Sequence, residues 1–326
     1  MKINRRIFCL ASSGVLMQTS MNVFANSDYP NKIIKATIPF PAGGGGDTLG
    51  RLIFNGLSEE LGQTIVIENI PGAGGNVGVG LASRAAADGY NLLYGTNGTH
   101  AINVNIYKKL GFDPINDFVP ISRFTEISAI VTVRSDLPVD SIKELIEYSQ
   151  KSQIPLSFGS AGNGTTSHLA GEMFKQMTGV NWLHVPYKGG AAALTDLMSG
   201  TIDVLIDVAP NVGQHIAGGR IKALAVTTSE RSTQFEQLPT VAESGYPDYV
   251  VTAWDGLFVR AATDPAVIEK LSHAVHKTLQ NPALQEKLTA RLATPSPLSP
   301  NDFRVFVIAE TKRWGDVVSK SGAAVD

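Results

Sequence analysis

The sequence predicts an α/β fold in which two similar units enclose a cleft. Three features carry this prediction. Short apolar stretches recur along the chain, each is followed by a glycine-rich or polar turn, and each turn leads into a segment with apolar residues at helical spacing. The same scheme runs a second time through the middle of the chain. In open α/β sheets, ligands bind outside the carboxyl ends of the strands, so the turns are where function is expected.

The first unit begins with a predicted strand at residues 32–40. Two more strands are predicted at 64–69 and 91–96, and helices are predicted at 48–62 and 77–87. The order strand, turn, helix, strand, turn, helix, strand is typical of parallel strands joined by helices. We therefore expect a parallel sheet in this part of the chain.

The middle of the chain repeats the scheme, whereas the C-terminal part does not. The repeat runs from a predicted strand at 128–134 to another at 221–228, and Ser141 is the expected N-cap of its first helix. Beyond it, residues 264–281 and 301–322 predict two amphipathic helices with no strand between them.

The chain is expected to cross between the two units twice. Strands near Val131–Val133 and Val251–Trp254 are the predicted crossings, and the C-terminal helices then return to the first unit. This gives a discontinuous domain 1, residues 26–130 plus 252–326, and a domain 2, residues 131–251. Loops at the carboxyl ends of both sheets would then face each other across a cleft.

Composition excludes several classes of protein. The chain has 326 residues, of which 43% are hydrophobic and 17% charged, and its formal net charge is −2. Such a balance is typical of a globular protein, and no basic excess points to nucleic acid. The one cysteine, Cys9, lies near the N-terminus. Beyond it the chain has no thiolate nucleophile, no disulfide and no cysteine-ligated metal site, and we expect no metal.

The first 25 residues resemble a signal peptide. Lys2, Arg5 and Arg6 precede a short apolar stretch at 7–17, and small residues lie at the positions that a signal peptidase requires, so cleavage is predicted after Ala25. A buried N-terminal helix is the alternative. The paired arginines leave Sec and Tat export both open. Together with the missing cysteines, this segment predicts a periplasmic protein.

Four consecutive glycines, Gly43–Gly46, follow the first predicted strand and precede a helix. Glycine lets the backbone approach a ligand closely, and a helix start offers free N–H groups and a partial positive charge. The turn therefore predicts an anion site without a basic side chain. Asp47 fits as an N-cap or as a hydrogen-bond acceptor. A turn without any ligand is the simpler alternative.

A dinucleotide site is a second interpretation of the same turn. Glu68 ends the second predicted strand, where a ribose-binding acid would lie. Two observations oppose it: the turn does not match G-x-G-x-x-G, and Asp47 would repel a pyrophosphate. No Walker loop and no G-x-S-x-G nucleophile elbow occur in the sequence.

Three further polar turns follow predicted strands, at residues 96–100, 159–168 and 207–211. They are rich in hydroxyl, amide and glycine N–H groups and poor in lysine, arginine and paired acids. Neutral donors of this kind bind a carboxylate well. The turns offer no evident general base or nucleophile, so binding is favoured over catalysis.

Several stretches of the sequence form a combination that is specific when taken together, among them IPFPAGGGGDTLGRL, VIENIPGAGGNVG, YGTNGTHAIN, LSFGSAGNGTTSHLAGEMF and VPYKGGAAALTDLMSGTIDV. With these stretches the chain resembles the Bug (TctC-type) family, the extracytoplasmic solute-binding receptors of tripartite tricarboxylate transporters. The resemblance implies a two-lobed periplasmic-binding-protein fold of two Rossmann-like domains that closes on a small organic acid.

The resemblance also implies which residues meet the ligand. One carboxylate would be held by backbone and ordered water from the first glycine turn and the turn after the third strand. The matching residues are Phe40, Ala42, Gly43, Asp47, Thr48, Asn97, Gly98 and Thr99. The opposite lobe would meet the distal part of the ligand through Ser160, Gly164, Thr165, His168 and Asp207. An ionised Asp207 would disfavour a second carboxylate, so a distal hydroxyl, amine or amide is expected.

The leading hypothesis is a non-enzymatic receptor that delivers a small carboxylate to a membrane permease. No cofactor is expected, and receptors of this kind are expected to be monomers. Two alternatives stay open at this point. One is an exported dinucleotide-dependent enzyme, and the other is a carboxylate sensor that feeds a signalling partner.

Overall fold

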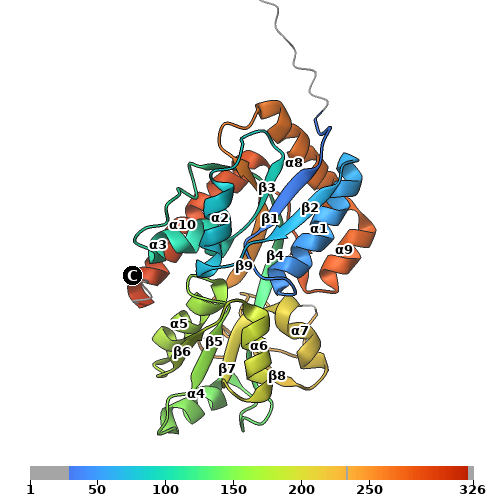
Figure 1. Cartoon of the computed structure of the whole chain (residues 1–326). Coiled ribbons are helices and arrows are strands. Elements are labelled where there is room, and N and C mark those ends of the chain that lie inside the picture. The colour runs from blue at the N-terminus through green and yellow to red at the C-terminus, as the bar shows by residue number, and fades with distance from the viewer. Residues whose placement is uncertain (1–28, 233, 322–326) are drawn as a thin grey trace, which may run out of the picture.

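A computed structural model describes residues 29–232 and 234–321 of the chain. The predicted signal peptide and its cleavage site after Ala25 lie outside these residues. Figure 1 shows two lobes, each with strands flanked by helices. The upper lobe combines the first elements of the chain with the last, and the lower lobe holds the middle. The predicted α/β architecture is confirmed. Within the described ranges, no helix is long and apolar enough to cross a bilayer.

The upper lobe is built on a mixed sheet. Its strands are β1 (Ile34–Ile38), β2 (Ile65–Asn69), β3 (Asn91–Thr96), β9 (Thr252–Arg260) and β10 (Ala293–Pro295). The first three pair in parallel, in the order β2-β1-β3, and β9 then pairs antiparallel to β3. The burial of β1 alternates along the strand: Ile34, Ala36 and Ile38 are fully buried, and Lys35 between them is exposed.

One long strand joins the lobes. β4 (Phe118–Arg134) pairs antiparallel with β9 as far as Ser128, and from Ala129 onward it pairs with β7 and β8 of the lower lobe. The strands of the lower lobe are β5 (Ser157–Ser160), β6 (Leu183–Pro186), β7 (Val204–Val208) and β8 (Ile221–Val226). β5, β6 and β7 are parallel to one another. The carboxyl ends of β1, β3, β5 and β7 therefore meet where the lobes join.

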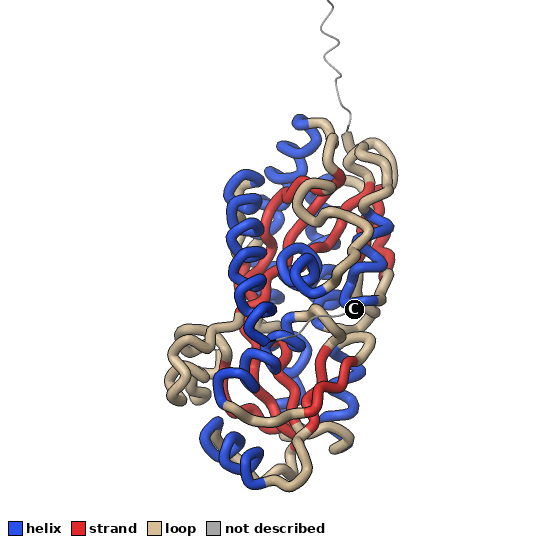
Figure 2. Tube along the Cα trace, turned by 90° about the vertical axis from the view of Figure 1, so that its left-hand side faces the viewer, coloured by secondary structure: helices blue, strands red, loops and turns tan. Residues whose placement is uncertain are grey.

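Helices cover the sheets of both lobes (Figures 1 and 2). Those of the upper lobe are α1 (Gly45–Leu61), α2 (Asn76–Ala82), α3 (Asn103–Ile106), α8 (Pro265–Gln280), α9 (Pro282–Thr289) and α10 (Pro300–Ser321). Those of the lower lobe are α4 (Ile142–Lys151), α5 (Thr166–Thr178), α6 (Gly190–Ser199) and α7 (Ala209–Ala217). Ser141 caps α4 by accepting a hydrogen bond from the N–H of Glu144, as predicted.

The parallel sheet predicted for the first unit is confirmed for β1, β2 and β3, and the antiparallel strands β9 and β4 extend it into a mixed sheet. One detail of the predicted fold is wrong. The C-terminal part is not purely helical: α9 and β10 lie between α8 and α10, and β10 pairs with β4. β10 has three residues and ends in proline, so its sequence shows no alternating pattern. It forms a strand because it pairs with β4.

A buried glutamate fixes the C-terminal helix to the upper sheet. Glu310 on α10 accepts hydrogen bonds from the indole N–H groups of Trp254 and Trp314, both at 3.1 Å, and forms an ion pair with Arg313 at 3.0 Å. Both indoles are almost fully buried. A buried carboxylate needs such partners, so this cluster specifies where α10 sits.

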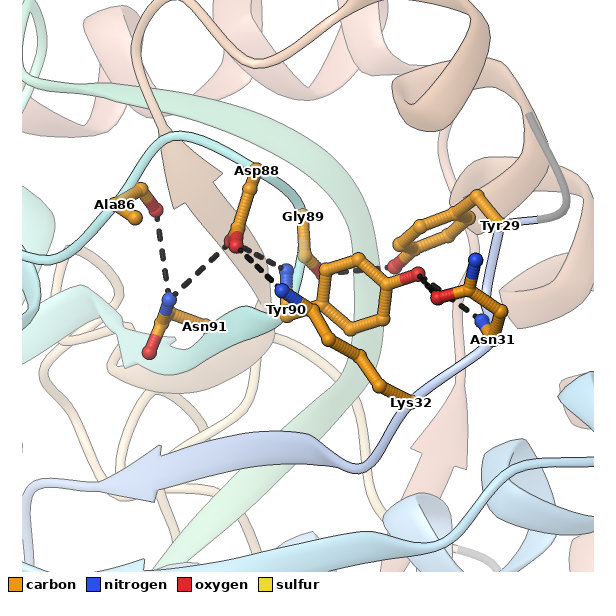
Figure 3. Close-up of polar contacts among 8 residues, drawn as sticks. All are labelled: Tyr29, Asn31, Lys32, Ala86, Asp88, Gly89, Tyr90 and Asn91. Atoms are coloured by element: carbon orange, nitrogen blue, oxygen red, sulfur yellow. Dashed lines mark hydrogen bonds and ion pairs between the residues drawn. The ribbon is translucent and has the colours of Figure 1, made fainter. Parts of the chain in front are cut away.

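The first described residues are bound to a turn that precedes β3 (Figure 3). The Tyr29 hydroxyl donates to the carbonyl of Gly89 at 2.7 Å, and the Tyr29 ring packs edge-on against Tyr90, with centroids 4.9 Å apart. Asn31 bonds the Tyr90 hydroxyl, and Lys32 pairs with Asp88 at 3.2 Å. The segment before β1 is thereby part of the folded core.

We expect Tyr29→Phe to lower the free energy of unfolding by about 1–2 kcal/mol, because the buried Gly89 carbonyl loses its donor. Tyr90→Phe is the control. It removes a hydroxyl whose hydrogen bonds lie at the surface, and it should cost no more than about 0.5 kcal/mol. Urea denaturation measures both. Equal losses in the two variants would contradict the role assigned to the buried bond.

Candidate ligand-binding site

A cavity of about 90 Å³ lies between the lobes, where the carboxyl ends of the strands meet. The upper lobe contributes the glycine turn at the start of α1, the end of β3 and the start of β9. The lower lobe contributes the start of α5, the turn before α6 and the end of β7.

The glycine turn places a bare helix end at the cavity. α1 begins at Gly45 with Gly44 as N-cap, and no side chain caps it. Gly44, Gly45 and Gly46 all line the cavity. A Cβ atom at Gly45 would lie 3.1 Å from Val208 of the lower lobe, so the absence of a side chain lets the lobes approach. Free N–H groups and the helix dipole favour an anion here.

Asp47 organises this turn. Its carboxylate accepts hydrogen bonds from the Gly43 N–H at 2.9 Å and the Asn69 amide at 2.8 Å, and it pairs with Arg51 at 2.9 Å. Burial opposes ionisation of Asp47, but the bonds from these three partners outweigh it and lower the pKa. Of the two roles predicted for Asp47, that of acceptor is confirmed and that of N-cap is wrong, because Gly44 holds the N-cap position.

Asn97 follows β3 and presents an unused donor. The side chain is 1% exposed and lines the cavity. Its Oδ1 accepts a hydrogen bond from the Thr166 hydroxyl of the lower lobe at 2.9 Å. Its Nδ2 has no hydrogen-bond partner among the described residues. A buried amide without a partner is costly, so Nδ2 is suited to a ligand acceptor.

The start of α5 supplies hydroxyl groups from the lower lobe. Thr165 is the N-cap and accepts from the N–H of His168, and its own hydroxyl donates to the Gly162 carbonyl at 2.6 Å. The Ser167 hydroxyl accepts from the N–H of Ala161 at 2.8 Å. Thr165, Thr166 and Ser167 line the cavity. These internal bonds hold the loop in one shape, so its donors are pre-organised.

Two histidines behind this loop support it. His168 and His184 stack with ring centroids 4.2 Å apart. The Gly164 N–H donates to His168 Nδ1 at 3.2 Å, and His184 Nε2 bonds the Ser160 hydroxyl at 2.7 Å. Burial lowers the pKa of His168 to about 3 and that of His184 to about 4. Both rings are therefore neutral at physiological pH and brace the loop without adding charge.

With Glu172, these histidines form a cluster whose ligand-type atoms lie within 4.8 Å of one another. The donors do not fit a metal ion well. His168 already uses the Nδ1 lone pair to accept from Gly164, which places its proton on Nε2. Lys175 bonds both carboxylate oxygens of Glu172 at 3.0 Å. A metal ion would have to displace both partners, so the cluster is better explained as packing.

Two buried carboxylates face the cavity. Asp207, at the end of β7, is held by the Val208 N–H at 2.9 Å and the Asn211 amide at 2.7 Å. Burial raises its pKa to about 6, and these two bonds oppose the rise. Asp255 on β9 accepts from the hydroxyls of Tyr94 and Thr125, and burial raises its pKa to about 6 as well. No lysine or arginine is among the described residues that line this cavity.

Contacts between the lobes surround the cavity. Besides the bond between Asn97 and Thr166, the Tyr107 hydroxyl of the upper lobe donates to the Asn163 carbonyl of the lower lobe at 3.2 Å. A Cβ atom at Gly74 would lie only 2.2 Å from that same carbonyl oxygen. The lobes are thus in contact on more than one side of the cavity.

The structure brings together part of the predicted site. Five predicted residues line the cavity: Phe40, Asn97, Gly98, Thr165 and Asp207. The other predicted residues are not among its lining: Ala42, Gly43, Asp47, Thr48, Thr99, Ser160, Gly164 and His168. Most of these shape the loops, as when the Thr99 hydroxyl accepts from the Thr96 N–H at 3.0 Å. Sequence reasoning missed Tyr94, Trp254 and Asp255, although an acid inside the apolar strand β9 was a usable signal.

The fold and the cavity together define a two-lobed solute-binding protein. The chain belongs to the TctC family, described as the tripartite tricarboxylate transporter family receptor, whose model matches residues 49–323. Members of this family are solute-binding proteins and not enzymes. Glu68, on which the dinucleotide alternative depended, forms an ion pair with Lys35 at 3.0 Å on the exposed side of the sheet.

Relatives of known sequence and structure support this family membership. The BugT protein of Bordetella pertussis is 33% identical over 315 residues, which cover 96% of this chain and 95% of BugT. The structure of Rpa4515 from R. palustris, solved with adipate, is 37% identical with a TM-score of 0.88, over 90% of this chain and 99% of that one. MatC from Rhodopseudomonas palustris, solved with malate, is 32% identical with a TM-score of 0.85, over 89% of this chain and 100% of that one.

Proposed function

We propose that this protein captures a small organic carboxylate between its lobes and delivers it to the permease of a tripartite tricarboxylate transporter. The observation that carries the proposal is the unpartnered amide of Asn97, buried in a cavity between the lobes and beside the bare start of α1. Both features are neutral donors, which suit an anion that must be released again. Relatives solved with adipate and malate support a carboxylate ligand.

The proposal includes export and domain organisation. The chain would act in the periplasm as a monomer, after cleavage behind Ala25. Residues 26–130 and 252–326 would form one domain and residues 131–251 the other. The change of partners along β4 at Ser128 supports a boundary close to residue 130.

A thermal-shift screen tests the proposal. The purified protein is heated with small mono-, di- and tricarboxylates, amino acids and NAD(P). A ligand at about 100 times its Kd should stabilise the fold by about 2.7 kcal/mol and raise the melting temperature visibly. We expect hits among the carboxylates. A shift with NAD(P) alone would refute the receptor function.

The charge on Asp207 should set the preference for the far end of the ligand. Succinate and 4-hydroxybutyrate differ only there, in a carboxylate against a hydroxymethyl group. At pH 7.5 Asp207 is ionised, because its pKa is about 6, and it should favour the hydroxyl, which donates to it. Lowering the pH to 5.5 protonates most of Asp207, so the preference should move toward succinate by up to about tenfold.

Asp207→Asn should move the preference toward succinate at pH 7.5 and reduce its pH dependence, while Asp255, whose pKa burial also raises to about 6, and the second carboxylate of succinate still titrate. Asp248→Asn, an exposed residue of the same lobe, is the charge-matched control and should change nothing. Isothermal titration calorimetry of both ligands measures the ratio of affinities. An unchanged ratio in Asp207→Asn would show that this carboxylate does not contact the ligand.

A further inference from the structure

A second cavity, of about 210 Å³, lies against the first one and has no role in the site described above. Both lobes form its walls. The upper lobe contributes residues 39–41 and 71–75 with Tyr107, and the lower lobe contributes 161–163 and 186–188. These segments follow β1, β2, α3, β5 and β6. The second cavity thus lies in the same interlobe cleft, where ligand groups are expected.

The two cavities share a wall made of Phe40, Pro41 and Ala161. The Phe40 ring lies between two glycines. A Cβ atom at Gly46 would be 3.3 Å from Phe40 Cδ2, and one at Gly75 would be 3.6 Å from Phe40 Cζ. Gly46 lines the first cavity and Gly75 the second. Phe40 therefore lies in the wall between the cavities, and its side chain has to move before one ligand can reach both.

The cavities carry opposite charge. Asp207 and Asp255 line the first, and the described lining of that cavity contains no basic residue. Lys188 lines the second, and no acidic residue is among the described residues around it. Lys188 is exposed and forms no ion pair with a described residue. The first cavity repels a second ligand carboxylate, and the second offers that carboxylate a cation.

The wall that the two cavities share and part of the lining of the second cavity are apolar. Four prolines line the second cavity together with Phe40: Pro39, Pro41, Pro71 and Pro186. A methylene chain buries favourably against such a wall, at about 0.8 kcal/mol for each CH₂ group. The order along the cleft is therefore neutral donors, apolar wall and lysine. That order matches carboxylate, hydrocarbon chain and second carboxylate.

We propose that the second cavity is a subsite for the far carboxylate of an elongated dicarboxylate, with Lys188 as its counter-charge. The proposal rests on the proposed function, because the near carboxylate has to occupy the first cavity. It names a ligand class that the first cavity alone does not select. Phe40 is then the side chain that must turn when such a ligand binds.

A charge-removal experiment tests this subsite. Isothermal titration calorimetry compares glutarate, adipate, pimelate and suberate with their monomethyl esters, which keep the length and lose the far charge. The proteins are the wild type, Lys188→Gln and Lys143→Gln, an exposed lysine on α4 that serves as the charge-matched control. Lys188→Gln should weaken the dicarboxylate that binds tightest at least tenfold, and it should leave the matching ester unchanged. Lys143→Gln should change neither.

The possible outcomes separate the two claims. If Lys188→Gln weakens diacid and ester equally, Lys188 attracts anions in general and the subsite is refuted. If the wild type binds the esters as tightly as the diacids, the subsite is refuted while the receptor function stands. If no carboxylate binds the wild type at all, the proposed function itself is wrong and the subsite falls with it.

Discussion

Gly74→Ala should weaken ligand binding by about 100-fold or more while leaving each lobe folded. The Cβ atom of an alanine here would lie 2.2 Å from the backbone oxygen of Asn163, across the boundary between the lobes. A backbone atom cannot rotate away as a side chain would, so the lobes must stay apart. The hydrogen bonds between the lobes, from Tyr107 to Asn163 and from Thr166 to Asn97, would then be strained or lost.

Gly62→Ala is the matched control for this experiment. Gly74 has a φ of +62° and Gly62 a φ of +64°, so alanine meets the same backbone strain of about 1–2 kcal/mol at either position. No atom lies within 4 Å of a Cβ atom at Gly62. Calorimetry with the carboxylate that binds tightest measures the affinity, and the melting temperature of the ligand-free protein measures the stability. The two together distinguish an effect on the approach of the lobes from an effect on folding. Equal affinities in the two variants would contradict a steric role for Gly74.

Gly74 also shows how far the sequence predicts this molecule. A cluster of glycines after a strand is readily recognised, and a glycine turn suggests close contact with a ligand. At Gly74 the close contact is with the other lobe. The identity of that partner depends on the relative placement of segments about 90 residues apart, which local pattern does not contain. Sequence therefore indicates where the backbone approaches something, and tertiary structure decides what.

The elements themselves were predictable where their patterns are continuous. The alternation of apolar stretch, glycine turn and amphipathic segment predicts most of the strands and helices of both lobes. The first half of β4 was missed because Pro120, Arg123 and Glu126 interrupt its apolar pattern. α1 begins at Gly45, earlier than the predicted residue 48, because glycine has a low helix propensity and tertiary context overrides it.

The residues of the candidate site also differ in whether the sequence predicts them. Asn97 and Thr165 lie in polar turns at strand ends that the pattern predicts, and the resemblance to the Bug (TctC-type) family implies these two residues within them. Tyr94 and Asp255 were not predicted, since they lie within strands, and strand residues alternate between faces. The pairing of β3 with β9 brings these two side chains into hydrogen-bond contact across 161 positions of sequence. No single segment of the sequence signals that pair.

Asn97→Asp should weaken carboxylate binding by about 100-fold or more at pH 7.5. The change is nearly isosteric and replaces only the amide that lacks a partner. A hydrogen bond to a charged ligand contributes about 1.5–3 kcal/mol, and the new carboxylate would add repulsion to a cavity that already holds Asp207 and Asp255.

Thr166→Val tests whether Asn97 affects binding through the ligand or through its hydrogen bond to the lower lobe. It removes the hydroxyl that donates to Asn97 Oδ1 and keeps both the shape of the side chain and the free Nδ2. We expect it to weaken binding by roughly tenfold at most, since a typical hydrogen bond contributes about 0.5–1.5 kcal/mol. Calorimetry at pH 7.5 compares the two variants. If Thr166→Val costs as much as Asn97→Asp, Asn97 acts by joining the lobes, and the ligand carboxylate is held elsewhere, with the start of α1 as the remaining donor group.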